Sequence, residues 1–194
     1  GYQLSGIISN PVLATAPQVA VNAVLWPKMQ IHTELHIPEQ LPDMTLAQQL
    51  FPAIQVWNIG GLLKLDASYD YGFGANGGAA KLGIRDGYIE HNELGLSIEG
   101  IGAELSLSNL PNLNTDGKQE LRCAKISYGG MEFNNLYAGF QIAEKELFID
   151  EVDVEWCDGH IYSYALRLNK NSENINATVF CDGLLLSEFI NTFG

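Results

Sequence analysis

Hydrophobic and polar residues alternate along much of the chain, which is typical of β-strands that bury one face. The pattern is clear from Met29 to Ile37, where Met29, Ile31, Thr33, Leu35 and Ile37 share one face and Gln30, His32, Glu34 and His36 share the other. Pro38 and Pro42 are expected to end this strand, because proline has no amide hydrogen to donate to a neighbouring strand.

The most regular alternation lies between residues 79 and 109. Its apolar positions are first Leu94, Leu96 and Ile98, and beyond Gly100 they become Ile101, Ala103, Leu105 and Leu107. This change of phase predicts a bulge or turn at Gly100. Asp86-Gly87 is a tight-turn signal and predicts that two strands meet there.

The second half of the chain predicts five further strands: Gln119 to Tyr128, Leu136 to Ile142, Glu146 to Cys157, His160 to Leu168 and Asn174 to Cys181. Turn signals separate the first four of them: Gly129-Gly130, Ala143-Glu144-Lys145 and Asp158-Gly159. In the third strand, Val152, Val154 and Trp156 alternate with acidic residues. Strands and turns in such close succession predict an antiparallel meander.

Two short helices are predicted, at residues 43–51 and 184–193, from runs of good helix formers. The fold class that follows is mainly β: an elongated, twisted antiparallel sheet that forms an open groove or a partly closed roll, with two short helices. We divide the chain into an extended N-terminal segment with the first strands, residues 1–43, and a β-repeat module ending in a short helix, residues 44–194.

The charge balance narrows the range of partners. The 194 residues include 10 Lys and Arg against 23 Asp and Glu, a net charge of -13. Such acidity opposes binding to nucleic acid and to anionic membrane surfaces. No apolar stretch is long enough to span a bilayer, and the start does not read as a signal peptide. We expect the chain to be a segment of a longer polypeptide.

Cys123, Cys157 and Cys181 are too few to pair completely, so at least one thiol is free. Each lies in a strand-like run beside an apolar residue and is interpreted as a small hydrophobic side chain, although two of them could form a disulfide.

Three motifs resemble sites of known chemistry. Gly72 to Gly77 matches the dinucleotide fingerprint in letters, but a strand-like sequence follows where a helix is required, so a hairpin loop is predicted. His32, Glu34 and His36 share one strand face and are spaced too widely to converge on a metal. Cys157 and His160 have ligand-like spacing without a second pair. We therefore expect no cofactor, no metal and no catalytic residue.

Residues 44–194 resemble the C-terminal region of YdbH-like proteins, which belong to the wider AsmA and TamB group. The resemblance rests on a Leu-rich helix at Thr45 to Phe51, then Gly61-Leu-Leu-Lys-Leu65, Leu82-Gly-Ile-Arg-Asp-Gly87, strand pairs with Gly-Gly or Asp-Gly centres, and Asp182-Gly-Leu-Leu-Leu-Ser-Glu-Phe-Ile190. It implies a periplasmic protein of Gram-negative bacteria, anchored in the inner membrane by a helix outside this sequence. An apolar β groove would carry phospholipid acyl chains towards the outer membrane. Three cysteines depart from what an oxidising periplasm favours.

The working hypothesis is a non-catalytic lipid-transport or outer-membrane-biogenesis segment that binds phospholipid or another acyl-chain ligand. Its further partners would be the rest of the same polypeptide and other envelope proteins. The candidate residues of the apolar groove or core are Leu94, Leu96, Ile98, Leu105, Leu107, Val152, Val154 and Trp156.

Three alternatives stay open. A β-sandwich-like adhesion module would bind glycan or protein through exposed Trp57, Tyr69, Tyr71 and Tyr88. A hydrolase would use carboxylates such as Asp150 and Asp153 in a polar pocket. The family has also been linked to dicarboxylate transport, for which this acidic chain offers few cations.

Overall fold

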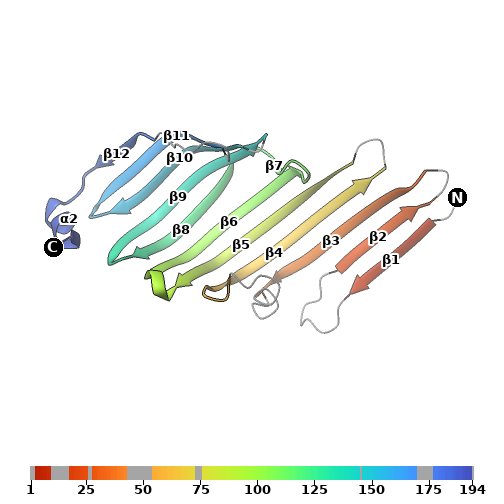
Figure 1. Ribbon diagram of the computed structural model, residues 1–194, viewed down its shortest axis with the longest axis horizontal. Coiled ribbons are helices and arrows are strands. Elements are labelled where there is room, and N and C mark those ends of the chain that lie inside the picture. Colours follow the sequence, from red (N-terminus) through yellow and green to blue (C-terminus); the bar gives the residue numbers. More distant parts are fainter. Residues whose placement is uncertain are drawn as a thin grey trace.

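The structure is a computed structural model that describes residues 3–9, 18–25, 28–42, 54–72, 76–144, 146–169 and 177–193. These residues form one open antiparallel sheet of twelve strands (Figure 1). In chain order the strands are β1 (Gln3–Ser9), β2 (Gln18–Val24), β3 (Gln30–Gln40), β4 (Asn58–Tyr71), β5 (Gly77–His91), β6 (Leu96–Asn109), β7 (Asn114–Thr115), β8 (Gln119–Tyr128), β9 (Met131–Ala143), β10 (Glu146–Trp156), β11 (Gly159–Asn169) and β12 (Val179–Asp182).

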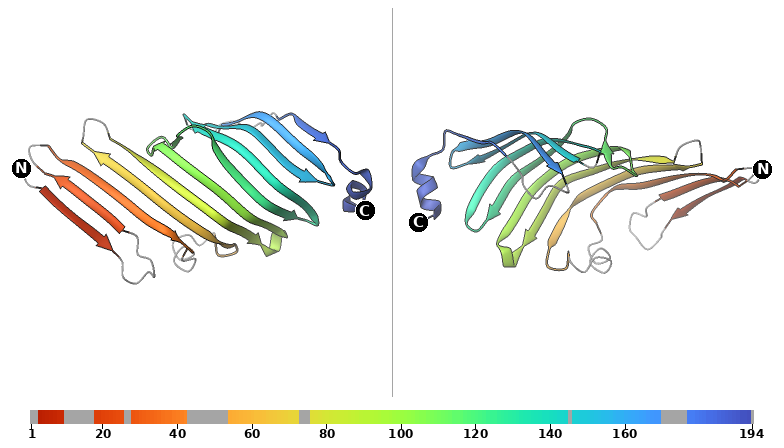
Figure 2. Two further views of the ribbon diagram at one scale, coloured as in Figure 1. Left: turned by 180° about the vertical axis from the view of Figure 1, so that it is seen from behind. Right: turned by 45° about the horizontal axis from the view of Figure 1, so that its top comes forward.

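Strands follow one another across the sheet in sequence order, except that the short β7 pairs with β6 and lies off the main path. The sheet is elongated and twisted, with β1 at one edge and β12 at the other (Figure 2). The predicted mainly β, antiparallel sheet is confirmed, and it is open. The described strands on both sides of residue 43 belong to this one sheet, because β3 pairs with β4.

Helix is scarce in the part of the chain that the structure describes. It contains one short helix, α2 (Leu186–Phe193), and one 3-10 turn, η2 (Asn92–Leu94). Helix α2 confirms the prediction for residues 184–193. The helix predicted at 43–51 lies outside the described residues, so the expectation of two short helices is not borne out.

The pairing register sorts the side chains onto two faces, because residues opposite one another on neighbouring strands point the same way. We call one the apolar face. Three of its cross-strand rows are Val19, Leu35, Ala67, Ala80 and Leu107; Ile37, Leu65, Leu82 and Leu105; and Ile59, Ile89, Ile98, Ile126 and Phe133. The opposite, polar face carries rows such as Lys64, Gly83, Glu104, Glu120, Gly139 and Glu151.

The turn predicted at Asp86-Gly87 was wrong, because these residues form a bulge inside a strand. β5 runs through Asp86-Gly87 without turning, and its register with β6 shifts there. Asp86 has a φ of 50°, a conformation that a bulge can use as well as a turn. Gly60-Gly61 likewise lies within the continuous strand β4, which shifts register against β5 at this point.

The predicted bulge at Gly100 is confirmed, since β6 continues through it and Gly100 has a φ of 64°. Pro38 does not end its strand as expected. β3 reaches Gln40, with a register shift between Ile37 and Gln40 that accommodates the missing amide hydrogen.

The predicted turns of the second half are largely confirmed. Gly129 and Gly130, with φ of 58° and 88°, join β8 to β9. The turn between β10 and β11 consists of Cys157 and Asp158, with φ of 49° and 58°, one residue earlier than predicted. Positive φ at both central residues is the geometry that tight hairpins prefer.

Candidate functional site: the apolar face

The apolar face brings together seven of the eight residues proposed for a groove or core. Leu96, Ile98, Leu105 and Leu107 lie on β6, and the shift at Gly100 keeps both pairs on the same face. Val152 belongs to it through the row Ala103, Leu121, Ala138 and Val152, and Val154 follows Val152 at a spacing of two. Leu94 is the exception, because it lies in η2 and is 52% exposed.

Trp156 anchors the C-terminal end of this face. Its ring lies 5.5 Å from that of Phe133 on β9 and 5.3 Å from that of Phe189 on α2. The backbone amide of Leu185 donates to the carbonyl of Cys157 at 2.7 Å, which fixes the start of the helical segment to the β10–β11 turn. Helix α2 thus packs at one end of the apolar face through Phe189, and it lies at the C-terminal edge of the sheet (Figure 1).

The remainder of the face has no second layer among the described residues, which form a single sheet with one short helix at its end. Large side chains are accordingly half-exposed, and none in this part of the chain is fully buried. Most of the buried hydrophobic side chains in the described part of the chain are small; these residues are Ala23, Ala80, Ile101 and Cys123. The accessible surface of 13027 Å² exceeds the roughly 9,100 Å² expected for a compact monomer of 21.3 kDa.

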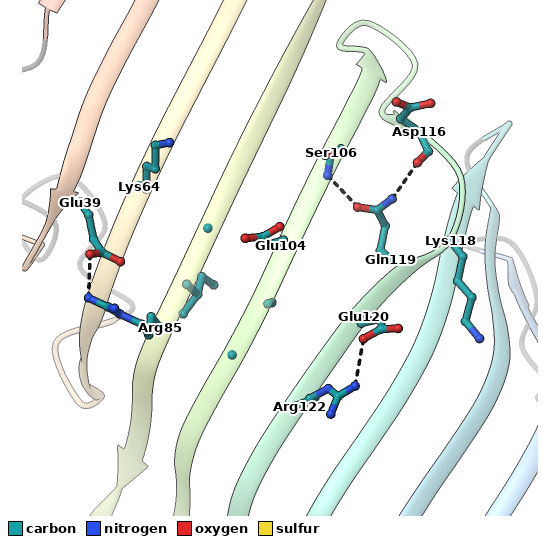
Figure 3. Close-up of a pocket in the computed structure, with 14 residues that line it drawn as sticks. Glu39, Lys64, Arg85, Glu104, Ser106, Asp116, Lys118, Gln119, Glu120 and Arg122 are labelled. Carbon is teal, nitrogen blue, oxygen red and sulfur yellow. Dashed lines mark hydrogen bonds and ion pairs between the residues drawn. The ribbon is translucent and has the colours of Figure 1, made fainter.

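The polar face holds a hollow of about 780 Å³ above β4, β5, β6 and β8 (Figure 3). Gly83 and Gly102 contribute no side chain to its floor. Its charged rim contains equal numbers of cations and carboxylates: Lys64, Arg85, Lys118 and Arg122, and Glu39, Glu104, Asp116 and Glu120.

Ion pairs already engage all four cations. Arg85 binds Glu39 at 2.7 Å and Arg122 binds Glu120 at 3.1 Å, both within the hollow. Lys64 pairs with Asp66 and Lys118 with Glu151 at its border. The hollow is therefore a neutralised polar surface without surplus positive charge for an anion.

Histidines on the polar face pair with carboxylates of adjacent strands. His32 Nδ1 lies 2.6 Å from Asp70, and its Nε2 lies 3.2 Å from Glu34. These hydrogen bonds, that to Asp70 foremost, raise the pKa of His32. His36 pairs with Asp66, and the pKa of that carboxyl is lowered by the imidazole and then by Lys64. The described residues include no group of three or more His, Cys, Asp or Glu arranged to hold a metal.

The aromatic residues suggested for an adhesion surface do not gather. Tyr69 and Tyr71 lie on the apolar face, opposite Thr33 and Ile31 of β3. Tyr88 lies on the polar face over Gly60, where a Cβ atom would be 2.4 Å from its ring. Trp57 packs edge-on against His91, with ring centroids 4.6 Å apart. The described sheet also lacks the second sheet of a sandwich.

The remaining motifs take structural positions. The glycine cluster that follows Tyr71 connects β4 to β5, so the helix that a dinucleotide site needs is replaced by a strand. Asp150 is exposed, and Asp153 lies 2.9 Å from His160 Nδ1. All three cysteines are free: Cys123 is buried, Cys157 is half-buried in a turn, and Cys181 is exposed.

Sequence reasoning missed an aromatic cluster on the polar face, formed by Tyr162, Tyr164 and Phe180. Tyr162 stacks on Phe180 with ring centroids 5.3 Å apart, and Tyr164 lies 5.6 Å from Tyr162. The alternation Tyr162-Ser-Tyr164 was visible in the sequence. The pairing of β11 with β12, which adds Phe180, was not.

No helix among the described residues has the length and hydrophobicity needed to cross a membrane. Comparisons with protein-family models, with curated proteins and with solved structures find no match to this chain. The resemblance to YdbH-like proteins therefore stays a prediction.

Proposed function

We propose that the apolar face binds acyl chains of phospholipid, and that the chain is a non-catalytic part of a lipid-transport scaffold in a bacterial envelope. One observation carries the proposal: a continuous apolar face spans the sheet, and among the described residues only α2 packs on it. Soluble monomers rarely expose contiguous apolar patches larger than a few hundred Å², so a face of this extent needs an occupant.

The chemistry of the face suits hydrocarbon chains. Its rows consist of Leu, Ile, Val, Ala and Phe side chains, and charged side chains stand on the opposite face. Burial of each methylene group contributes about 0.8 kcal/mol, so a long acyl chain lying across several strands would gain a large driving force without any specific polar contact. Headgroups would then remain in water at the border of the sheet.

Dicarboxylate binding is less well supported. The hollow above β4, β5, β6 and β8 has four cations, but four carboxylates line it as well, and the whole chain has a net charge of -13. A dianion would have to displace existing ion pairs against this field.

The test compares two substitutions at neighbouring positions of β6 that point to opposite faces. Leu105→Asn places an amide on the apolar face, whereas Glu104→Asn places the same group on the polar face. The purified chain, free of detergent, is titrated with a fluorescent phosphatidylethanolamine whose label reports an apolar environment. We expect Leu105→Asn to weaken binding at least about threefold, through lost apolar contact area, and Glu104→Asn to leave it unchanged.

Circular dichroism of both variants verifies that the sheet is retained. Absence of lipid uptake by the unsubstituted chain, or equal effects of the two folded variants, would overturn the proposal.

A further inference from the structure

The aromatic cluster of Tyr162, Tyr164 and Phe180 is an exposed apolar patch on an otherwise polar surface. Tyr164 is 55% exposed and Phe180 is 44% exposed. The register confirms the shared face, since Tyr162 opposes Phe180 of β12 on one side and Asp153 of β10 on the other. The patch lies at the C-terminal edge of the sheet, on the side opposite to the acyl-binding face proposed above.

Carboxylates surround these rings. Glu151 is the cross-strand neighbour of Tyr164, as Asp153 is of Tyr162. Glu155 and Asp182 flank His160 on its two neighbouring strands. The cations that face the same carboxylates are Lys118, 3.3 Å from Glu151, and His160 when it is protonated. The patch therefore combines π surfaces with excess negative charge.

Elsewhere on the polar face, aromatic rings hold the cationic groups of Arg and Lys side chains. Arg122 lies over the ring of Tyr137 at 5.2 Å, with Lys118 at 5.9 Å from the same ring. Arg167 lies over Phe148 at 5.1 Å and also pairs with Glu146. Twice, then, an aromatic ring beside a carboxylate holds a cation. Among the described residues, no Lys or Arg lies over Tyr162, Tyr164 or Phe180.

We propose that the aromatic cluster is a docking surface for an arginine-containing basic segment of a partner protein. Guanidinium groups would stack on the exposed rings and pair with the flanking carboxylates, as Arg167 does with Phe148 and Glu146. Complementary charge would also steer a basic partner to a chain of net charge -13. Exposed Tyr and Phe side chains are the kind of residue that anchors protein interfaces.

A glycan is the main competing ligand, because sugars also stack on exposed aromatic rings. The distribution of charge favours the cation: an uncharged sugar gains nothing from the excess of carboxylates, whereas a guanidinium pairs with them directly.

The experiment uses a blocked peptide of three Gly-Arg repeats as probe and measures its affinity for the purified chain by calorimetry. Tyr164→Leu removes an exposed ring while keeping an apolar side chain, and Tyr88→Leu is the matched control on the same face, away from the cluster. We expect Tyr164→Leu to weaken binding about fivefold and Tyr88→Leu to leave it unchanged. Asp153→Asn should weaken binding as well.

The same peptide with Lys in place of Arg should bind less tightly, because the planar guanidinium stacks on a ring and offers several donors to a carboxylate, whereas ammonium is a compact and more strongly hydrated charge. If the arginine peptide bound the unsubstituted chain and the Tyr164→Leu variant equally well, its binding would reflect only general charge attraction. That result would overturn the proposal. It would also be overturned if a chitin or cellulose oligosaccharide bound at this patch, insensitive to salt and to Asp153→Asn, while the arginine peptide did not bind.

Discussion

At the residue scale, the three cysteines differ in exposure although the sequence gives them similar surroundings. Cys123 is 5% exposed in the middle of β8, and its burial raises the pKa of the thiol. Cys181 is exposed on the edge strand β12. Since thiolates are the reactive species, these environments separate the reactivities of the two side chains.

We predict that a maleimide reagent labels Cys181 first and Cys123 only after unfolding. Mass spectrometry of the native chain after short exposure should find the label on the peptide containing Cys181. Cys181→Ser should remove this early labelling, and labelling in denaturant serves as the control for total thiol. Early modification of Cys123 would contradict the packing of β8.

The pairing of His32 with Asp70 and Glu34 makes stability depend on pH. The folded state raises the pKa of His32 above its ordinary value, so protonated His32 is favoured in the folded chain. Its contribution is therefore fully present below the unfolded pKa of about 6.5 and is lost as pH rises through the folded pKa.

We predict that His32→Gln reduces the free energy of unfolding more at pH 5.5 than at pH 8.5. Urea denaturation at both pH values measures the difference in the free energy of unfolding between the variant and the unsubstituted chain. Because the side chain is partly exposed to solvent, the effect should stay below about 1 kcal/mol. A larger loss at pH 8.5 than at pH 5.5 would contradict the proposed protonation.

At the element scale, the alternation of apolar and polar residues was enough to predict most strands and their faces. The change of phase at Gly100 was readable because side-chain direction has a period of two, so any inserted residue shifts the apolar set. Asp86-Gly87 was misinterpreted, because a tight turn and a bulge both use positive φ, and local sequence does not distinguish them. Only the partner strand decides whether the chain reverses there.

The bulge between β4 and β5 explains the glycine at position 61. A Cβ on Gly61 would lie 2.5 Å from the Cα of Gly87, and Gly61 has a φ of 118°. We predict that Gly61→Ala lowers the free energy of unfolding by about 2 kcal/mol, from backbone strain and the close approach of β5. Gly77→Ala is the matched control at the start of β5, since nothing lies within 4 Å of its added Cβ.

Thermal or urea denaturation measures the free energy of unfolding of the Gly61→Ala and Gly77→Ala variants. The control should change stability by less than about 0.5 kcal/mol. Similar stabilities of the two variants would show that β4 and β5 do not approach each other as described.

At the scale of the whole molecule, what sequence could not establish was how the apolar face is covered. Alternation is a local signal, whereas closure into a roll or packing of a second layer depends on segments far apart in the chain. The structure gives an open sheet whose residues Leu105 and Val152 are half-exposed. Trp156 is the informative case: its strand position was predicted, but its contact with Phe189 of α2 depends on how the chain end folds back.

An open single layer has a measurable consequence for size and cooperativity. A compact domain of 194 residues has a radius of gyration of about 16 Å, and the elongated sheet should exceed this value in small-angle X-ray scattering. Its urea m-value should be lower than that of a globular protein of equal length, because fewer apolar groups become newly exposed on unfolding. Both measurements need dilution series, since a second copy on the apolar face would raise the apparent mass. A concentration-independent radius near 16 Å would mean that the sheet closes on itself, and with it the apolar surface proposed for acyl chains would disappear.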